Sequence, residues 1–113
     1  MPEIPWFKEF SSAITICDAK GILLDMNDAA EDIFKDDGGR ALIGSNVLDC
    51  HPNPARGKLE RMMDKKTSNV YFTVEKGKRR LFFQTPWYRD GQYAGFIEIS
   101  FEVSAEIPTF NRN

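Results

Sequence analysis

A strict alternation of apolar and polar residues near the C-terminal end constrains the fold of this chain most strongly. Within residues 97–103 every second side chain is apolar, and Glu98, Ser100 and Glu102 lie between them. A period of two is typical of a β-strand with one buried and one solvated face. The pattern therefore predicts that Ile99 is buried and that Ser100 faces solvent.

Turn residues place further strands at both ends of the chain. Asp18-Ala19-Lys20-Gly21 fits a type I turn between two apolar runs, residues 13–17 and 22–26. Asp90-Gly91 is a strong hairpin sequence and precedes the alternating strand. Alternation over residues 70–75 adds another strand to this final group.

The middle of the chain has helical spacing. Asn27 is suited to cap a helix over residues 28–34, and Pro54 is suited to the start of a helix over residues 55–66. Pro5 suggests a short helix in the lead-in as well. Strands at both ends of a helical middle predict an α+β fold, with one antiparallel sheet and the helices packed on one face.

The length of 113 residues suits one domain with one core. We expect a lead-in helix or arm over residues 1–10, a domain over residues 11–104 and a tail over residues 105–113. The net charge of −2 argues against a nucleic-acid partner. No apolar run approaches the roughly 20 residues of a membrane span, and the start is not a secretory signal, so we expect a cytoplasmic protein without membrane contact.

Chemistry-bearing residues are few. Cys17 and Cys50 are interpreted as free thiols in a reducing compartment, and a single histidine leaves too few ligands for a zinc site. The sequence contains neither a nucleophile motif nor a glycine-rich phosphate loop. We therefore expect a protein that is not an enzyme and that has no catalytic or metal residues.

Three stretches together resemble a PAS domain. Residues 18–34 resemble the opening hairpin, asparagine and helix of that family, and residues 89–99 resemble its final hairpin. Gly44 and the run Cys50-His51-Pro52 are similar to a PAS subset often found beside hemerythrin-like domains. The resemblance covers about residues 11–104. It implies a five-stranded antiparallel sheet whose helices cup a pocket, used in signal transduction for sensing or for protein–protein interaction.

The expected pocket has six candidate ligand-binding residues, and each has a structural alternative. His51 either contacts a ligand or organises its loop through a ring hydrogen bond, and Cys50 is either reactive or an inert buried thiol. The other candidates belong to a soft pocket or simply to the core: Met62, Met63, Phe83 and Ile97.

The resemblance leaves the cofactor unknown. His51 is a possible axial ligand for haem iron. Flavin adduct chemistry is not expected, because photoreceptor members carry a cysteine directly after Gly-x-Asn, whereas Gly44-Ser45-Asn46 is followed here by Val47.

Three aromatic residues in the lead-in, Trp6, Phe7 and Phe10, predict a homodimer interface, because one small domain cannot easily bury all of them. Three functions stay open at this stage. The chain is a small-molecule sensor acting on an output protein or domain, a ligand-free dimerisation scaffold, or a carrier of a cofactor such as haem in a redox or gas sensor.

Overall fold

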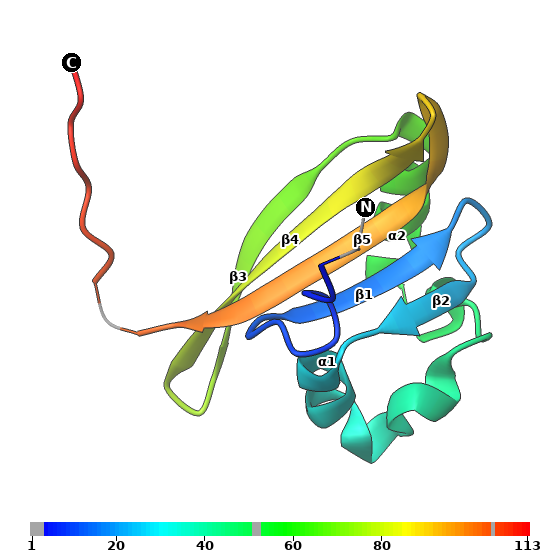
Figure 1. Cartoon of the computed structure of the whole chain (residues 1–113), viewed down its shortest axis with the longest axis horizontal. Helices are drawn as coiled ribbons and strands as arrows, with labels where there is room; N and C mark the ends of the chain where they lie inside the picture. Colours follow the sequence, from blue (N-terminus) through cyan, green and yellow to red (C-terminus); the bar gives the residue numbers. More distant parts are fainter. Residues whose placement is uncertain (1–3, 51–52, 105) are drawn as a thin grey trace.

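The computed structural model describes residues 4–50, 53–104 and 106–113. Within them, five antiparallel strands form one sheet in the order β2-β1-β5-β4-β3 (Figure 1). The strands are β1 (Ala13–Asp18), β2 (Leu23–Met26), β3 (Asn69–Glu75), β4 (Lys78–Arg89) and β5 (Gln92–Val103). Segments from opposite ends of the sequence thus meet in the middle of the sheet, where β5 pairs with β1.

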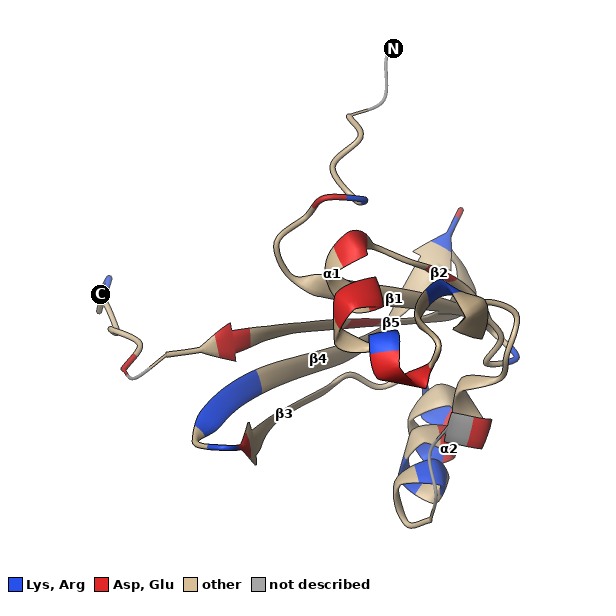
Figure 2. Ribbon diagram, turned by 90° about the horizontal axis from the view of Figure 1, so that it is seen from below, with Lys and Arg blue, Asp and Glu red and all other residues tan. Residues whose placement is uncertain are grey.

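The helical segments connect β2 to β3 and cover one face of the sheet. They are α1 (Asp28–Ile33), the 3-10 helices η1 (Lys35–Asp37), η2 (Gly39–Leu42) and η3 (Val47–Cys50), and α2 (Ala55–Lys65). Figures 1 and 2 show α2 on one side of the sheet and the N-terminal segment on the other. The expected α+β class, with helices on one face, is confirmed.

Local sequence explains the turns and helix starts. The Asp18 side chain accepts hydrogen bonds from the amides of Lys20 and Ile22, both at 2.9 Å, and this closes the predicted first turn. Asn27 caps α1 as predicted, since its side-chain oxygen accepts from the Ala30 amide at 3.1 Å. Helix α2 begins directly after Pro54, where a missing amide costs little.

The apolar core lies between the helices and the sheet, in two clusters. One joins β1, β2 and α1, and the other joins β1, β5 and α2. The buried members are Ala13, Leu23, Met26 and Ala30 in the first cluster, and Cys17, Leu59, Met62 and Phe96 in the second. Residues of both clusters line the candidate site described below.

The face assignment predicted for β5 is wrong at Ser100, which is only 4% exposed. Ser100 points toward the helix-covered face, where its hydroxyl accepts from Arg80 Nε at 3.0 Å and its carbonyl accepts from Arg80 Nη2 at 3.1 Å. Ile99 is only partly buried and lies on the opposite face. Because β5 is the central strand and its inward polar groups are hydrogen-bonded, the polar residues in the middle of its alternation lie inside the fold.

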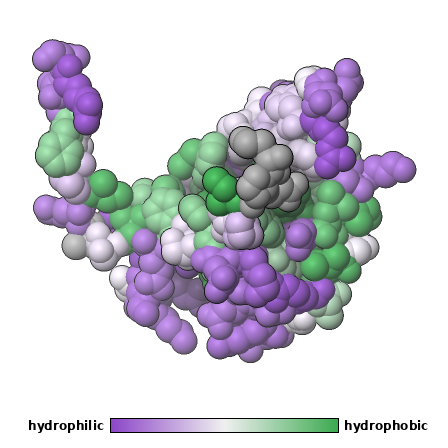
Figure 3. Space-filling view, viewed as in Figure 1, coloured by the Kyte–Doolittle hydropathy of each residue, from purple (hydrophilic) through white to green (hydrophobic). Residues whose placement is uncertain are grey.

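The opposite, helix-free side of β3, β4 and β5 is largely apolar, and we call it the open face. Figure 3 shows apolar surface on this side of the sheet between more hydrophilic hairpin ends. Its exposed large apolar side chains are Val70, Phe72, Val74, Phe83 and Phe101. An apolar patch of this kind on a small domain usually marks a contact surface.

The N-terminal arm, residues 4–12, contains a turn where the sequence suggested a short helix. The Phe10 amide donates to the Phe7 carbonyl at 3.3 Å, and the Trp6 ring packs edge-on against the rings of Phe7 and Phe10. Trp6 and Phe10 nevertheless stay exposed. Across the described ranges, no helix is long and apolar enough to cross a membrane.

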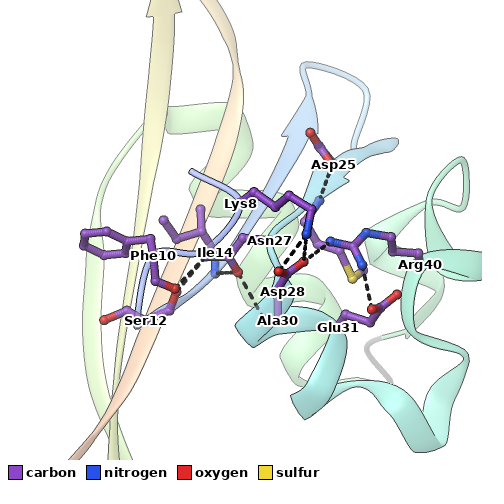
Figure 4. A network of polar contacts seen from close by, with 11 residues as sticks. Lys8, Phe10, Ser12, Ile14, Asp25, Asn27, Asp28, Ala30, Glu31 and Arg40 are labelled. Atoms are coloured by element: carbon purple, nitrogen blue, oxygen red, sulfur yellow. Dashed lines mark hydrogen bonds and ion pairs between the residues drawn. The ribbon is translucent and has the colours of Figure 1, made fainter. Parts of the chain in front are cut away.

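A chain of ion pairs links this arm to the helical side (Figure 4). Lys8 Nζ contacts Asp28 at 2.9 Å, Arg40 Nη2 contacts the same carboxylate at 2.7 Å, and Arg40 Nη1 contacts Glu31 at 2.6 Å. Hydrogen bonds from Lys8 and then Arg40 lower the pKa of Asp28. These ion pairs connect the arm to α1 and η2.

Candidate functional site

A cavity of about 540 Å³ lies between the sheet and the helical segments. This volume is within the range of pockets that hold small organic molecules. Most of its wall is apolar and comes from both ends of the chain, including Leu23, Met26, Leu42, Leu59, Phe82 and Phe96. The cavity therefore offers a mainly apolar environment in which a few polar groups determine the orientation of a ligand.

Those polar groups form a row across the sheet floor, which we call the polar row. Strand register places Thr15 of β1 opposite Glu98 of β5, Glu98 opposite Gln84 of β4, and Gln84 opposite Asn69 of β3. Gln84 Nε2 donates to Glu98 Oε2 at 2.9 Å, and Asn69 Nδ2 lies 3.4 Å from Gln84 Oε1. Thr15, Gln84 and Glu98 line the cavity.

An aromatic pair lies beside the polar row. Tyr71 of β3 and Phe82 of β4 are register partners, and their rings stack with centroids 5.1 Å apart and planes 5° apart. Both residues line the cavity. Burial and then the negative charge of Glu98 raise the pKa of Tyr71, which keeps its hydroxyl protonated.

Cys17 contributes a buried thiol to the cavity wall. Burial raises the pKa of this thiol, so the reactive thiolate form is disfavoured. The Cys17 carbonyl accepts from Trp87 Nε1 at 3.0 Å and fixes β1 against the far end of β4. This environment suits an apolar wall residue and not a nucleophile.

The methionines of α2 lie beside the cavity and not on its wall. Met62 is buried in the second core cluster, and Met63 packs against that cluster. The helical spacing of these residues therefore reflects core packing, which was one of the two alternatives from sequence.

Strand alternation shows where the side chains of the two strand candidates, Phe83 and Ile97, point. Phe83 lies on the open face, because its neighbours Phe82 and Gln84 line the cavity and successive strand residues alternate. Ile97 borders the cavity between Phe96 and Glu98, but the same alternation directs its side chain toward the open face.

The Cys-His-Pro loop is described only in part. Cys50 ends η3, and nothing further is described of its side chain. His51 and Pro52 lie outside the described residues, so the role assigned to His51 stays a prediction. In the described part of the chain, no three His, Cys, Asp or Glu side chains are grouped so that they could hold a metal ion.

Sequence reasoning did not identify Thr15, Tyr71, Gln84 or Glu98 as site residues. The available pattern was the alternation itself, which placed polar residues at regular positions on the final strands. Glu98 was assigned to the solvated face, because local periodicity does not indicate which face the helices cover, and Thr15, Tyr71 and Gln84 were assigned to no face.

Comparisons with known proteins identify the fold. No family model matches the sequence, and no curated protein matches it. Among solved structures, the PAS domain of BvgS from Bordetella pertussis has a TM-score of 0.67 at 18% identity, over 88% of this chain and 82% of that one. The fold is that of a PAS domain.

Two further structures agree with this PAS fold. The PAS domain of nitrogen regulation protein NR(II) from Vibrio parahaemolyticus gives a TM-score of 0.61 at 14% identity, over 90% of this chain and all of that one. A sensory box sensor histidine kinase from Vibrio cholerae gives 0.63 at 19% identity, over 87% and 86%. At these identities the likeness establishes the fold alone.

Proposed function

We propose that this PAS domain is a sensor and signalling module that binds a small organic molecule in its cavity. The observation that carries the proposal is the cavity of about 540 Å³, apolar in its walls and crossed by the polar row. The similar folds of a sensor histidine kinase and of a nitrogen regulation protein support a role in signalling. Ligand occupancy would bias the association with an output protein or domain.

The domain works by binding and not by catalysis in this proposal. The neutral state of the Cys17 thiol supports it, since a nucleophile would need the opposite environment. The buried free thiol also supports work in the reducing cytoplasm. Membership of the subset with a Cys50-His51-Pro52 loop is part of the proposal and rests on the sequence resemblance.

Filling the cavity tests the sensor function. Thr15→Phe adds an aromatic ring at the cavity floor, so the affinity for any molecule bound there should fall at least about tenfold. Stability should change by about 1 kcal/mol or less, because the ring enters existing space. Native mass spectrometry and analysis of small molecules extracted from the purified protein measure occupancy, and urea denaturation measures stability.

Thr73→Phe is the matched control, since Thr73 lies on β3, is exposed and does not line the cavity. This variant should keep the occupancy of the wild type. If the wild type carries no extractable molecule and binds none from a screen, the sensor proposal fails.

Haem binding is the alternative that His51 suggested. Haem carries two carboxylates, yet the charged residues among the described cavity wall are Asp37 and Glu98, both acidic. Uncompensated negative charges in a mainly apolar cavity repel one another. The described residues therefore do not fit haem, and haem has no part in the proposed function.

We also propose that the domain forms a homodimer through the open face and the N-terminal arm. The supporting observation is the exposed apolar area on β3, β4 and β5, next to an arm in which Trp6 and Phe10 are exposed. Phe83 is 36% exposed near the centre of this face. Phe83→Glu should raise the dimer dissociation constant at least about tenfold, because a carboxylate would have to be desolvated on association.

Light scattering over a concentration series measures this effect. Ile33→Glu is the matched control, since Ile33 is 40% exposed but lies on α1. It should leave the dissociation constant within about twofold. A wild-type protein that stays monomeric at high concentration would remove the dimer proposal and leave the sensor proposal intact.

A further inference from the structure

We infer that the cavity selects a cationic or uncharged small molecule that presents an N–H or O–H group to Glu98, and that it excludes anions. This inference deepens the proposed sensor function and rests on it. It assigns a chemical class to the ligand from the hydrogen-bond direction and the charges of the cavity wall.

The first observation is the direction of the polar row. A carboxylate only accepts hydrogen bonds, so Glu98 requires the nitrogen end of the Gln84 amide. Gln84 then directs its oxygen toward Asn69, whose amide nitrogen supplies the donor. The row therefore runs from donors at β3 to an acceptor at β5. A ligand that meets Glu98 is bound most strongly if it supplies another donor.

The second observation is the charge around the cavity. Asp37 and Glu98 line it, and no Lys or Arg does so in the ranges that the structure describes. Arg80 lies on the same face of β4, two residues from Phe82, but it is not part of the cavity wall, and its Nε and Nη2 donate to Ser100. An anionic ligand would be desolvated near acidic groups without a cation to compensate it, whereas a cation would be stabilised.

The third observation is the stacked pair beside the polar row. Tyr71 and Phe82 present aromatic surface within the same cavity as Glu98. A flat ring packs favourably against such a surface, and an attached ammonium group gains from aromatic faces as well. The ligand class that combines these features is an aromatic or heteroaromatic molecule with an amine, amidine, ring N–H or hydroxyl group.

Three probes that share an indole ring separate the charge preference from the ring preference. Tryptamine is a cation, tryptophol is neutral with a hydroxyl donor, and indole-3-acetate is an anion. Calorimetric titration of the wild-type chain should give tryptamine at least about tenfold tighter binding than indole-3-acetate, with tryptophol between them. This comparison needs no variant.

Glu98→Gln then assigns the preference to one carboxylate. The change keeps the side-chain shape. It should lower the affinity for tryptamine about tenfold, so that tryptamine binds little more tightly than indole-3-acetate. Glu102→Gln is the matched control, because Glu102 lies on the same face of β5 but is exposed and outside the cavity wall. Thr15→Phe should weaken all probes, which shows that they enter the cavity.

Each outcome bears on the inference. Indole-3-acetate binding as tightly as tryptamine would overturn it, and so would an unchanged preference in Glu98→Gln. Absence of binding by all three probes at millimolar concentration would also overturn it. If a different molecule is then extracted from the purified protein, the sensor function stands without this ligand class. If no molecule is extracted or bound, both proposals fail.

Discussion

Replacing Asn27 with alanine should lower the free energy of unfolding by about 3–5 kcal/mol. Asn27 is 0% exposed and makes bonds with both ends of its amide (Figure 4). Its oxygen accepts from the amides of Ile14 at 2.9 Å and Ala30 at 3.1 Å, and its nitrogen donates to the Ser12 carbonyl at 2.8 Å. Alanine would leave all of these backbone groups without this partner, in a site that water does not reach.

Urea denaturation of three variants tests this role. Asn27→Asp keeps the acceptor but replaces the donor with an oxygen facing carbonyls, so it should destabilise the protein about as strongly as alanine. Asn46→Ala is the control, because Asn46 is partly exposed and its side chain bonds, among the described residues, to the Leu48 amide and the Lys20 carbonyl. It should cost about 1 kcal/mol. Equal losses at Asn27 and Asn46 would contradict the central role of Asn27.

Gly95→Ala should cost about 4 kcal/mol or more, or prevent folding altogether. A Cβ atom at Gly95 would lie 1.9 Å from the Cys17 carbonyl oxygen and 2.7 Å from the Asp18 carbonyl carbon, and φ there is +145°. Both neighbours are backbone atoms of β1, so they cannot move without separating β1 from β5. The bond from Trp87 to the Cys17 carbonyl would be lost with them.

Gly91→Ala separates this clash from backbone strain. Gly91 has φ of +78°, and no atom lies within 4 Å of the position that an alanine methyl group would take there. Only the strain of the left-handed conformation applies at this residue, so a loss of about 1–2 kcal/mol is expected. Thermal melts of both variants give the comparison, and a Gly95→Ala protein as stable as Gly91→Ala would show that β1 and β5 are less tightly joined.

Local chemistry explains why much of the fold was predictable from sequence. The turn at Asp18, the cap at Asn27 and the start of α2 after Pro54 each depend on residues close together in the chain. The faces of β5 were not predictable in the same way. The alternation defines two faces, but which of them meets the helices depends on pairing between β1 and β5, which come from opposite ends of the sequence.

The candidate site shows the same limit. Thr15, Glu98 and Gln84 become neighbours only through strand register, and no local pattern links them. Polar residues in an amphipathic strand normally indicate the face that is exposed to solvent. Gln84 is nevertheless buried, and its amide nitrogen donates to Glu98 inside the fold. For Met62 and Met63 the sequence left pocket and core open, because soft apolar residues at helical spacing suit both, and the structure uses them for packing.

The ion-pair chain from Lys8 through Asp28 to Arg40 has a thermodynamic consequence. Arg40 belongs to η2, and Leu42 at the end of η2 borders the cavity. The arm and the cavity wall are thus connected through one element, η2. A ligand of the proposed site that holds η2 in place would favour docking of the arm, and because linkage is reciprocal, a docked arm would favour that ligand by the same free energy.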